Sequence, residues 1–315
     1  MSFLSSHKRA IAGLVAAFIA IVLITGAPLC LNAPNKNGAN KQAASSAATS
    51  DITPGLNTAD AAKAKSKGLK VDKTYSLDLD GNKKKEKLII KRLSYSKEDS
   101  AYNKIGVYVN GKLCWSKSAS TNFYTSVTAR LVTLRNKKSF LWVKATGPDG
   151  VCFANSLLSY KSKKIKTAYD LRVPSKYDYG VDRGSSFAGV SGNTIKMKHW
   201  FMSATTGVSS FTYSYKYSKG KLKRTSSEAP VSYNAYADGT KYTGSSTWLR
   251  CESALKASTT PGGKKKAYTI GAKSPFKVTK IKISGTKVYY QVSNGKKSAW
   301  ISGLTRYTVY NARYR

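Results

Sequence analysis

One short loop holds the tightest cluster of carboxylates in this sequence. It runs from Asp78 to Glu86 and reads Asp-Leu-Asp-Gly-Asn-Lys-Lys-Lys-Glu. Side-chain oxygens stand at loop positions one, three, five and nine, a backbone carbonyl is available at position seven, and the glycine allows a sharp turn. Calcium is bound in proteins by oxygen ligands at this kind of spacing. The loop therefore predicts one Ca²⁺ site, with ligands from Asp78, Asp80, Asn82, Lys84 (through its carbonyl) and Glu86.

Two features of the chain weigh against the metal. Position five is Asn82 instead of an aspartate, and three lysines fill the loop, so the expected affinity is lowered. Two later turns that occupy a corresponding place, Arg135–Ser139 and Ser191–Thr194, contain no acidic residue, so at most one site is expected. The alternative is an Asp-Gly hairpin turn that holds no ion.

Aromatic residues alternate with small or polar ones near residue 215. Phe211, Tyr213, Tyr215 and Tyr217 are separated by Thr, Ser and Lys, and a period of two places all four rings on one face of a strand. Together with Trp300, Tyr213 and Tyr215 are the candidate ligand-binding rings, suited to a glycan or another stacking ligand. The alternative is an inward face that packs on a neighbouring sheet, because aromatic burial supplies much of a β core.

No catalytic constellation is evident. His199 is the only histidine outside the N-terminal segment, and a nucleophilic site would have to combine it with, for example, Cys152 or Asp170. No nucleophile-elbow or cysteine-protease signature surrounds it. The sequence therefore predicts no catalytic residue, although a pair of distant carboxylates suited to glycoside hydrolysis stays open.

Basic residues dominate the charge. The formal net charge is +39, and lysine greatly outnumbers arginine. Lysine offers a hydrated point charge, whereas sequence-specific nucleic-acid readers use arginine for bidentate contacts. The composition thus indicates diffuse attraction to anionic polymers or membrane surfaces, and no specific nucleic-acid partner.

Four basic runs fall at expected turns. They are Lys83–Lys85, Lys161–Lys166, Lys219–Arg224 and Lys264–Lys266. If the surrounding strands stack in register, the first three runs gather at related edges and form a cationic surface for teichoic-acid-like or other anionic wall polymers. The alternative is that these lysines are solvated turn residues that protect sheet edges.

A hairpin motif recurs and defines the elements that carry these residues. It consists of a Tyr followed four residues later by Lys and five residues later by Leu or Ile, at Tyr108–Leu113, Tyr160–Ile165 and Tyr217–Leu222, with spacings of 52 and 57 residues. Such a recurrence indicates a repeated supersecondary unit. The runs of β-forming residues around it predict three units of four antiparallel strands within residues 71–228.

The Asp-x-Asp-Gly loop between two strands resembles the loops of FG-GAP and VCBS-type repeats of exported bacterial proteins. This resemblance implies that each unit is a propeller-like blade. Three blades are fewer than usual for closure. An open stack, a partial propeller and a β-sandwich therefore remain as alternatives.

Residues 247–315 are expected to form a small separate β domain and a C-terminal tail, after a connection at 229–246. The segments Ala254–Ala257, Ala267–Ile270 and Phe276–Ile281, with Trp300-Ile301 after Asn294-Gly295, resemble bacterial Src-homology-3-like domains. This resemblance covers under a fifth of the chain. It implies a small barrel of a kind that, in several exported bacterial proteins, binds cell-wall peptides or glycans.

The N-terminal residues indicate export. Residues 1–33 combine a charged start with an apolar run, which fits a signal peptide or an uncleaved signal anchor formed by an apolar helix. Residues 34–70 contain almost no large apolar residues and are expected to be a disordered linker. Of the four cysteines, Cys30 lies in the N-terminal apolar segment. The other three, Cys114, Cys152 and Cys251, have no metal-ligand spacing, allow at most one disulfide among them, and are expected to be buried free thiols.

The sequence thus predicts an all-β protein with three propeller-like repeats and a C-terminal barrel. We expect an exported, cell-surface protein of a Gram-positive bacterium that binds a cell-wall polymer or peptidoglycan without catalysis, and that is either released after cleavage of residues 1–33 or held at the membrane by them. The alternatives are a wall-processing hydrolase with a targeting module and a calcium-stabilised adhesion scaffold.

Overall fold

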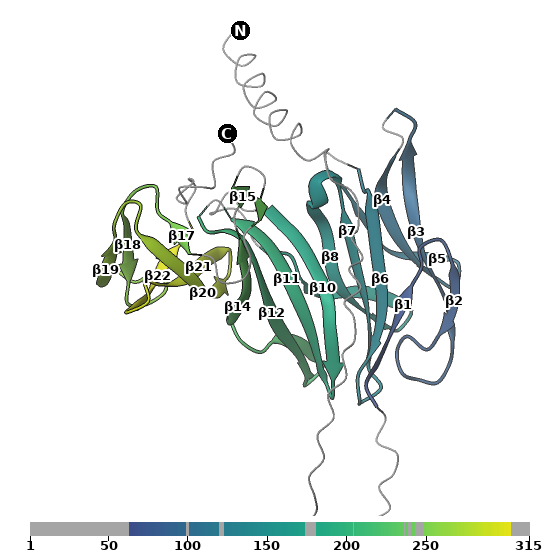
Figure 1. Cartoon of the computed structure of the whole chain (residues 1–315). Helices are drawn as coiled ribbons and strands as arrows, with labels where there is room; N and C mark the ends of the chain where they lie inside the picture. Colours follow the sequence, from purple (N-terminus) through teal and green to yellow (C-terminus); the bar gives the residue numbers. More distant parts are fainter. Residues whose placement is uncertain are drawn as a thin grey trace, which may run out of the picture. The chain divides into compact units, whose positions relative to one another are not determined.

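The computed structural model describes residues 63–303 except 99–100, 120–122, 174–180, 204, 236, 239–240 and 243–247 (Figure 1). This part of the chain is all-β, as predicted, and its strands pair antiparallel. Its one helical element is the single 3-10 turn η1, Pro148–Gly150. Among the described residues, no helix has the length and apolar character needed to cross a membrane. The predicted apolar helix at 1–33, most of the predicted linker and the C-terminal tail lie outside the described residues.

The first unit is a meander of four strands in the order β2-β3-β4-β5. Its strands are β2 (Thr74–Leu77), β3 (Glu86–Ser96), β4 (Ala101–Val109) and β5 (Lys112–Ser118). Asn110 and Gly111 join β4 to β5 with φ of 49° and 81°. Two positive φ values are what a tight two-residue hairpin turn requires, and Asn-Gly supplies them at low cost.

The second unit has one strand more than predicted. Its order is β1-β6-β7-β8-β9, with β1 (Lys65–Leu69), β6 (Ser126–Thr133), β7 (Ser139–Thr146), β8 (Cys152–Lys161) and β9 (Lys164–Asp170). The prediction that the disordered linker extends to residue 70 is therefore wrong at its end. Leu69, 7% exposed, enters the core, and pairing with β6 satisfies the backbone of a segment that has few apolar side chains.

The third unit continues into the C-terminal part of the chain. It contains β10 (Val181–Ser191), β11 (Thr194–Ser203), β12 (Gly207–Ser218) and β13 (Lys221–Arg224). A further strand, β14 (Glu228–Ala235), pairs with β12 through its second half and with β20 through its first three residues. The prediction that 229–246 is only a connection is thus wrong, because β12 is long enough to pair with β13 at one end and β14 at the other.

The C-terminal strands follow the order β20-β21-β22-β18-β19, with β17 also paired to β20. They are β17 (Leu249–Arg250), β18 (Leu255–Ser258), β19 (Lys266–Ile270), β20 (Pro275–Ser284), β21 (Lys287–Ser293) and β22 (Ser298–Ser302). A short ladder of β15 (Ala237–Asp238) and β16 (Lys241–Tyr242) precedes them. Their core residues belong to the same buried cluster as those of the third unit.

The second unit is apolar on both faces. Along β7, Leu141 and Val143 belong to a core shared with the first unit, which contributes buried residues of β3 and β4. The alternate residues Phe140 and Trp142 belong to the core shared with β11 and β12 of the third unit. Two buried faces explain why β7 and β8 contain nearly continuous apolar runs instead of a strict alternation of apolar and polar residues.

Corresponding turns of successive units lie against one another. A Cβ atom on Gly81 would stand 2.7 Å from the carbonyl oxygen of Lys137, in the β6–β7 turn. From that same turn, the Arg135 amide donates a hydrogen bond to the Gly192 carbonyl oxygen over 2.9 Å, in the β10–β11 turn. The three units therefore stack in the same register, turn beside turn.

This contact yields a stability prediction. Gly81 and Gly111 both have positive φ, 86° and 81°, so alanine is strained at either position. Only at Gly81 does the added methyl group meet a neighbouring backbone, since nothing lies within 4 Å of a Cβ on Gly111. We expect Gly81→Ala to lower the free energy of unfolding by about 1 to 3 kcal/mol more than Gly111→Ala, measured by urea unfolding in a chelator-containing buffer. Equal losses would contradict the stacking of these turns.

Candidate functional site

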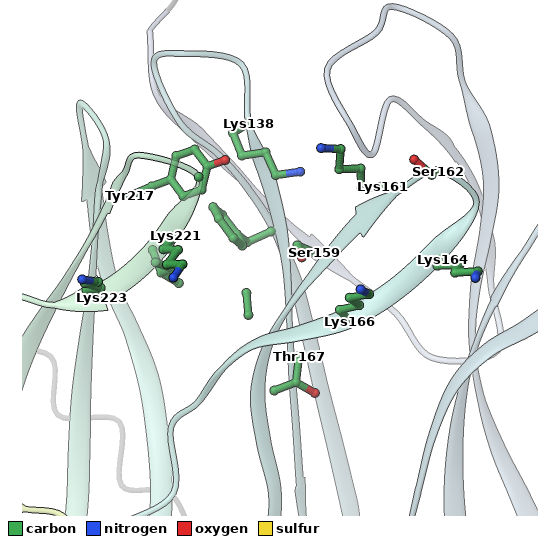
Figure 2. A pocket seen from close by; sticks show the side chains of 14 residues that line it. Lys138, Ser159, Lys161, Ser162, Lys164, Lys166, Thr167, Tyr217, Lys221 and Lys223 are labelled. Carbon is green, nitrogen blue, oxygen red and sulfur yellow. The ribbon is translucent and has the colours of Figure 1, made fainter.

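A lysine-rich groove lies between the second and third units (Figure 2). It has a volume of about 610 Å³. The β8–β9 hairpin forms one wall, the β12–β13 hairpin forms the other, and residues of β7 and the turn before it complete the lining. Its cationic residues are Lys138, Lys161, Lys164, Lys166, Lys221 and Lys223. No carboxylate lines it, so the groove offers an anion several ammonium groups and no opposing charge.

Hairpin geometry explains why these lysines face the same space. The turns contain Ser162-Lys163, with φ of 51° and 61°, and Lys219-Gly220, with φ of 48° and 75°. Each wall strand then alternates lysine with an apolar residue. On β13, Leu222 is 7% exposed and enters the core, which leaves the lysines on either side of it exposed to solvent. A period of two thus separates the core residue from the cationic ones.

The apolar part of the lining is held by aromatic packing. The rings of Phe140 and Tyr217 meet edge to face, with their centroids 5.5 Å apart. Both side chains belong to the interface between the second and third units. The walls of the groove are therefore positioned by core packing, not by loops.

Lys138 is the most enclosed of the six lysines. It is half-buried, and its Nζ donates a hydrogen bond to the carbonyl oxygen of Tyr160 over 3.2 Å. Burial lowers the pKa of Lys138, the Asp80 carboxylate opposes this shift, and the positive charge of Lys161 adds to it. Within the described part of the chain, none of the six lysines forms an ion pair with a carboxylate. The ammonium groups of this groove therefore remain available to a bound anion.

The groove unites two of the four basic runs that the sequence indicated. Residues of Lys161–Lys166 and of Lys219–Arg224 line it from opposite sides, whereas Lys83–Lys85 and Lys264–Lys266 do not line it. Sequence reasoning missed Lys138, which lies far from both runs in the chain. One feature of the sequence could have identified Lys138: it lies in the turn of the second unit that corresponds to the Asp78–Glu86 loop of the first.

The carboxylates of the Asp78–Glu86 loop do converge. Carboxylate oxygens of Asp78, Asp80 and Glu86 all lie within 4.8 Å of one another. One Ca²⁺ with oxygen ligands at about 2.3 to 2.6 Å can join atoms at such separations, so these three residues fit the ion. The Asn82 side chain is engaged within the loop, because its Oδ1 accepts a hydrogen bond from the Lys84 amide over 2.7 Å and its Nδ2 donates one to Asp80 Oδ2 over 3.1 Å. Three of the five predicted ligands are thus brought together by their side chains.

The loop also satisfies much of its own polarity. Asp78 Oδ1 accepts a hydrogen bond from the Gly81 amide over 2.7 Å, and its Oδ2 accepts one from Lys83 over 2.9 Å. Glu86, 7% exposed, accepts a hydrogen bond from the Leu79 amide over 3.0 Å. These bonds hold the carboxylates in place for an ion, and they also stabilise the turn without one.

The predicted ligand-binding aromatics lie in the core. Tyr213 and Tyr215 are each 2% exposed and Trp300 is 7% exposed, so none presents a ring face to solvent. Tyr215 packs edge to face on Tyr169 at 4.7 Å between centroids. An exposed platform at these three residues is therefore a wrong prediction, and the alternative of inward packing describes Tyr213 and Tyr215. For Tyr213 and Tyr215 the physical reason is that the third unit buries this aromatic face against the second. Trp300 lies on β22, an inner strand between β21 and β18 on which Ala299–Ile301 are all buried.

His199 is enclosed by aromatic rings. It is 1% exposed, stacks on Phe211 at 5.4 Å between centroids, and its Nε2 lies 3.0 Å from the Tyr215 hydroxyl. Burial, with a smaller contribution from the charge of Arg224, lowers the pKa of this imidazole to about 3. The ring is therefore neutral at physiological pH.

The candidate catalytic partners of His199 are engaged elsewhere. The Cys152 thiol donates a hydrogen bond to the Ala154 carbonyl oxygen over 3.3 Å, and burial raises its pKa. Asp170 pairs with Arg172 over 2.6 Å. Cys114, Cys152 and Cys251 are all free thiols, as predicted, but Cys114 is only half-buried. Nothing in these contacts assembles a nucleophile, a base and an orienting acid.

The enclosure of His199 yields a pH prediction. The imidazole has a pKa of about 3 when folded and an ordinary value of 6.5, so the unfolded chain binds more protons between these pH values. Its contribution to the free energy of unfolding is therefore full above pH 6.5 and is lost as the pH falls towards 3. We expect the His199 ring resonances to stay unshifted between about pH 8 and 5, and to titrate near 6.5 in urea, by NMR. Titration of the folded protein near pH 6.5 would contradict the burial.

A direct titration is needed because another buried group acts in the opposite direction. Asp182 accepts hydrogen bonds from the Val173 and Gly184 amides, and burial raises the pKa of its carboxyl group to about 6. Its contribution to stability is full below its ordinary pKa and is lost as the pH rises through 6. A global stability profile would sum the two effects, whereas the ring resonances of His199 report on one.

Comparison with models of protein families, with curated proteins and with solved structures finds no match to this chain. Its function must therefore be argued from the groove and the loop themselves. The groove offers an anion six lysines, and the loop offers a divalent cation three carboxylates.

Proposed function

We propose that this protein is a non-enzymatic binder of an anionic polymer of the bacterial envelope. The observation that carries the proposal is the groove lined by six lysines and no carboxylate. Placing like charges together costs free energy in the folded protein, and a bound polyanion relieves that cost. A cationic groove of this kind binds through the summed charge of many weak contacts, as suits a polymer attached to a cell wall.

The chemistry of the lining favours phosphate groups without bases. Every cation in the groove is a lysine, which binds phosphate as a point charge, and no arginine lines it. Phe140 is 1% exposed and cannot stack on a nucleobase. Tyr217 is the single partly exposed ring of the lining, so the groove lacks the series of aromatic rings on which successive bases stack. Wall polymers of the teichoic-acid type have repeated phosphodiesters, and peptidoglycan carries carboxylates that a lysine groove also accepts.

The proposed location is the outer surface of a Gram-positive cell. This part of the proposal is supported by the apolar segment within residues 1–33, as a signal peptide or as an anchor that keeps the protein at the membrane. The low-apolar segment that follows supplies a spacer.

The proposed architecture is a partial propeller followed by a Src-homology-3-like barrel. Two observations support the blades: corresponding turns of the three units touch, and the second unit is buried on both faces. The C-terminal module rests on its resemblance in sequence and on its antiparallel strands in the order β20-β21-β22-β18-β19.

Charge reversal tests the groove. The groove variant is Lys166→Glu/Lys221→Glu/Lys223→Glu. The control variant is Lys256→Glu/Lys266→Glu/Lys296→Glu, which makes the same change in net charge on exposed residues of the C-terminal strands and turns. Since an exposed charge pair contributes about 0.2 to 1 kcal/mol, we expect the groove variant to bind isolated Gram-positive cell walls at least about tenfold more weakly. Wild-type retention should also fall with salt. Equal retention of both variants would refute the proposed groove, and no wall retention at any salt would refute wall binding.

A second candidate role is the binding of one calcium ion that stabilises the first unit. The observation that favours it is the convergence of Asp78, Asp80 and Glu86 within 4.8 Å. The ion would join the β2–β3 loop to the start of β3, because Glu86 is the first residue of that strand. Its role would be structural, in an adhesion scaffold.

Thermal unfolding with and without a chelator tests this role. Calcium at about 100 times its dissociation constant adds about 2.7 kcal/mol to stability, so we expect the chelator to lower the melting temperature by several degrees. Asp80→Ala should abolish the response to calcium. Asp72→Ala, which removes an exposed carboxylate paired with Arg92, should keep it. A melting temperature that does not respond to calcium would leave the loop as a metal-free turn.

A further inference from the structure

A second cationic groove lies between the first and second units. It has a volume of about 540 Å³ and is lined by the β4–β5 hairpin on one side and the β8–β9 hairpin on the other. Its lining is Lys112, Leu113, Cys114, Ser162, Lys163, Lys164, Ile165 and Lys166, again with no carboxylate. The first groove is therefore not an isolated feature of one interface.

The two grooves share a wall. Ser162, Lys164 and Lys166 line both of them. The β8–β9 hairpin thus separates the grooves and contributes lysines to each, so that cationic surface continues from the first unit to the third.

The repeated hairpin motif builds this surface. The lysine of the motif is Lys112 in the first unit, Lys164 in the second and Lys221 in the third, and each one lines a groove. Each of these lysines is the first residue after a two-residue turn, and its side chain is exposed. Stacking the units in one register then aligns a lysine from every hairpin.

We infer that the two grooves form one track that binds a single extended phosphate polymer across all three units. This inference rests on the proposed function and specifies its ligand: a linear chain of repeated phosphate groups, long enough to occupy both grooves. Binding in the second groove becomes intramolecular once the first is occupied, so affinity rises with chain length without new kinds of contact. A small anion would fill one groove and gain nothing from the other.

Cys114 provides a natural reporter for the second groove. It is half-buried and lines this groove, with its Sγ 3.9 Å from the Lys163 carbonyl oxygen. Cys152 and Cys251 are buried, so an alkylating reagent should reach Cys114 faster than either. A polymer lying in the second groove should protect Cys114.

The experiment measures binding of linear polyphosphate of about 5 and about 100 units to the full chain by calorimetry, expressed per phosphate. We compare wild type with Lys112→Glu/Lys163→Glu in the second groove, Lys221→Glu/Lys223→Glu in the first, and Lys256→Glu/Lys296→Glu as the charge-matched control. We expect the long polymer to bind wild type at least about tenfold more tightly than the short one, and to slow alkylation of Cys114. The second-groove variant should lose this gain in affinity while still binding the short polymer. The control should keep both the gain in affinity for the long polymer and the binding of the short one.

The outcomes separate the track from the proposed function. Equal affinity per phosphate for both lengths, or an unchanged length dependence in Lys112→Glu/Lys163→Glu, would overturn the track and leave the first groove in place. If neither polymer binds wild type, the proposed function itself fails. Polyglutamate of matched length binding as tightly as polyphosphate would overturn the assignment of phosphate.

Discussion

The structure depends on the burial of both faces of the second unit. In β7, Phe140 and Trp142 enter one core while Leu141 and Val143 enter the other, so a single strand holds two neighbours in place. Removing apolar surface from water is worth about 25 cal/mol per Å², and here it acts on two interfaces at once. The first and third units are thereby held in register with the second, and their hairpins lie where successive grooves can form.

Buried polar groups make this packing more specific than apolar contact alone. Asn155 on β8 accepts hydrogen bonds from the Trp142 indole and from the Ser185 hydroxyl, each over 3.0 Å. These bonds tie β7, β8 and β10 to one alignment, because a shifted strand would leave Asn155 Oδ1 buried without its two donors. The neutral ring of His199 acts similarly on β11 and β12, through its contact with the Tyr215 hydroxyl. His199, the residue that a catalytic site would have had to use, thus stabilises the fold.

The same stacking accounts for the charge distribution around the grooves. Alternation along β9 and β13 sends apolar residues inward and lysines outward, and the register of the units then brings lysines from different hairpins together. The clustered lysines repel one another, and this repulsion lowers the stability of the folded protein. Most of these side chains are exposed, so water and salt screen the repulsion. Lys138 is the exception: its pKa is lowered by partial burial, and its bond to the Tyr160 carbonyl together with the charge of Asp80 offsets only part of that cost. The carboxylate loop of the first unit therefore contributes to the electrostatics of the groove as well as to its own turn.

Local sequence accounts for the strand content, the positive-φ hairpin turns and the recurrence of the Tyr-x-x-x-Lys motif, because these depend on local alternation and on residues such as Asn110 and Gly111 that favour one turn. It also brought three of the predicted metal ligands together, since Asp78, Asp80 and Glu86 are close in the chain. Long-range packing, in contrast, buries Tyr213, Tyr215 and Trp300. It also pairs Lys65–Leu69 and Glu228–Ala235 as strands, and it brings Lys138 together with lysines of two distant hairpins. The physical reason is that a period of two shows which residues share a face, whereas what covers that face depends on contacts between units far apart in the chain.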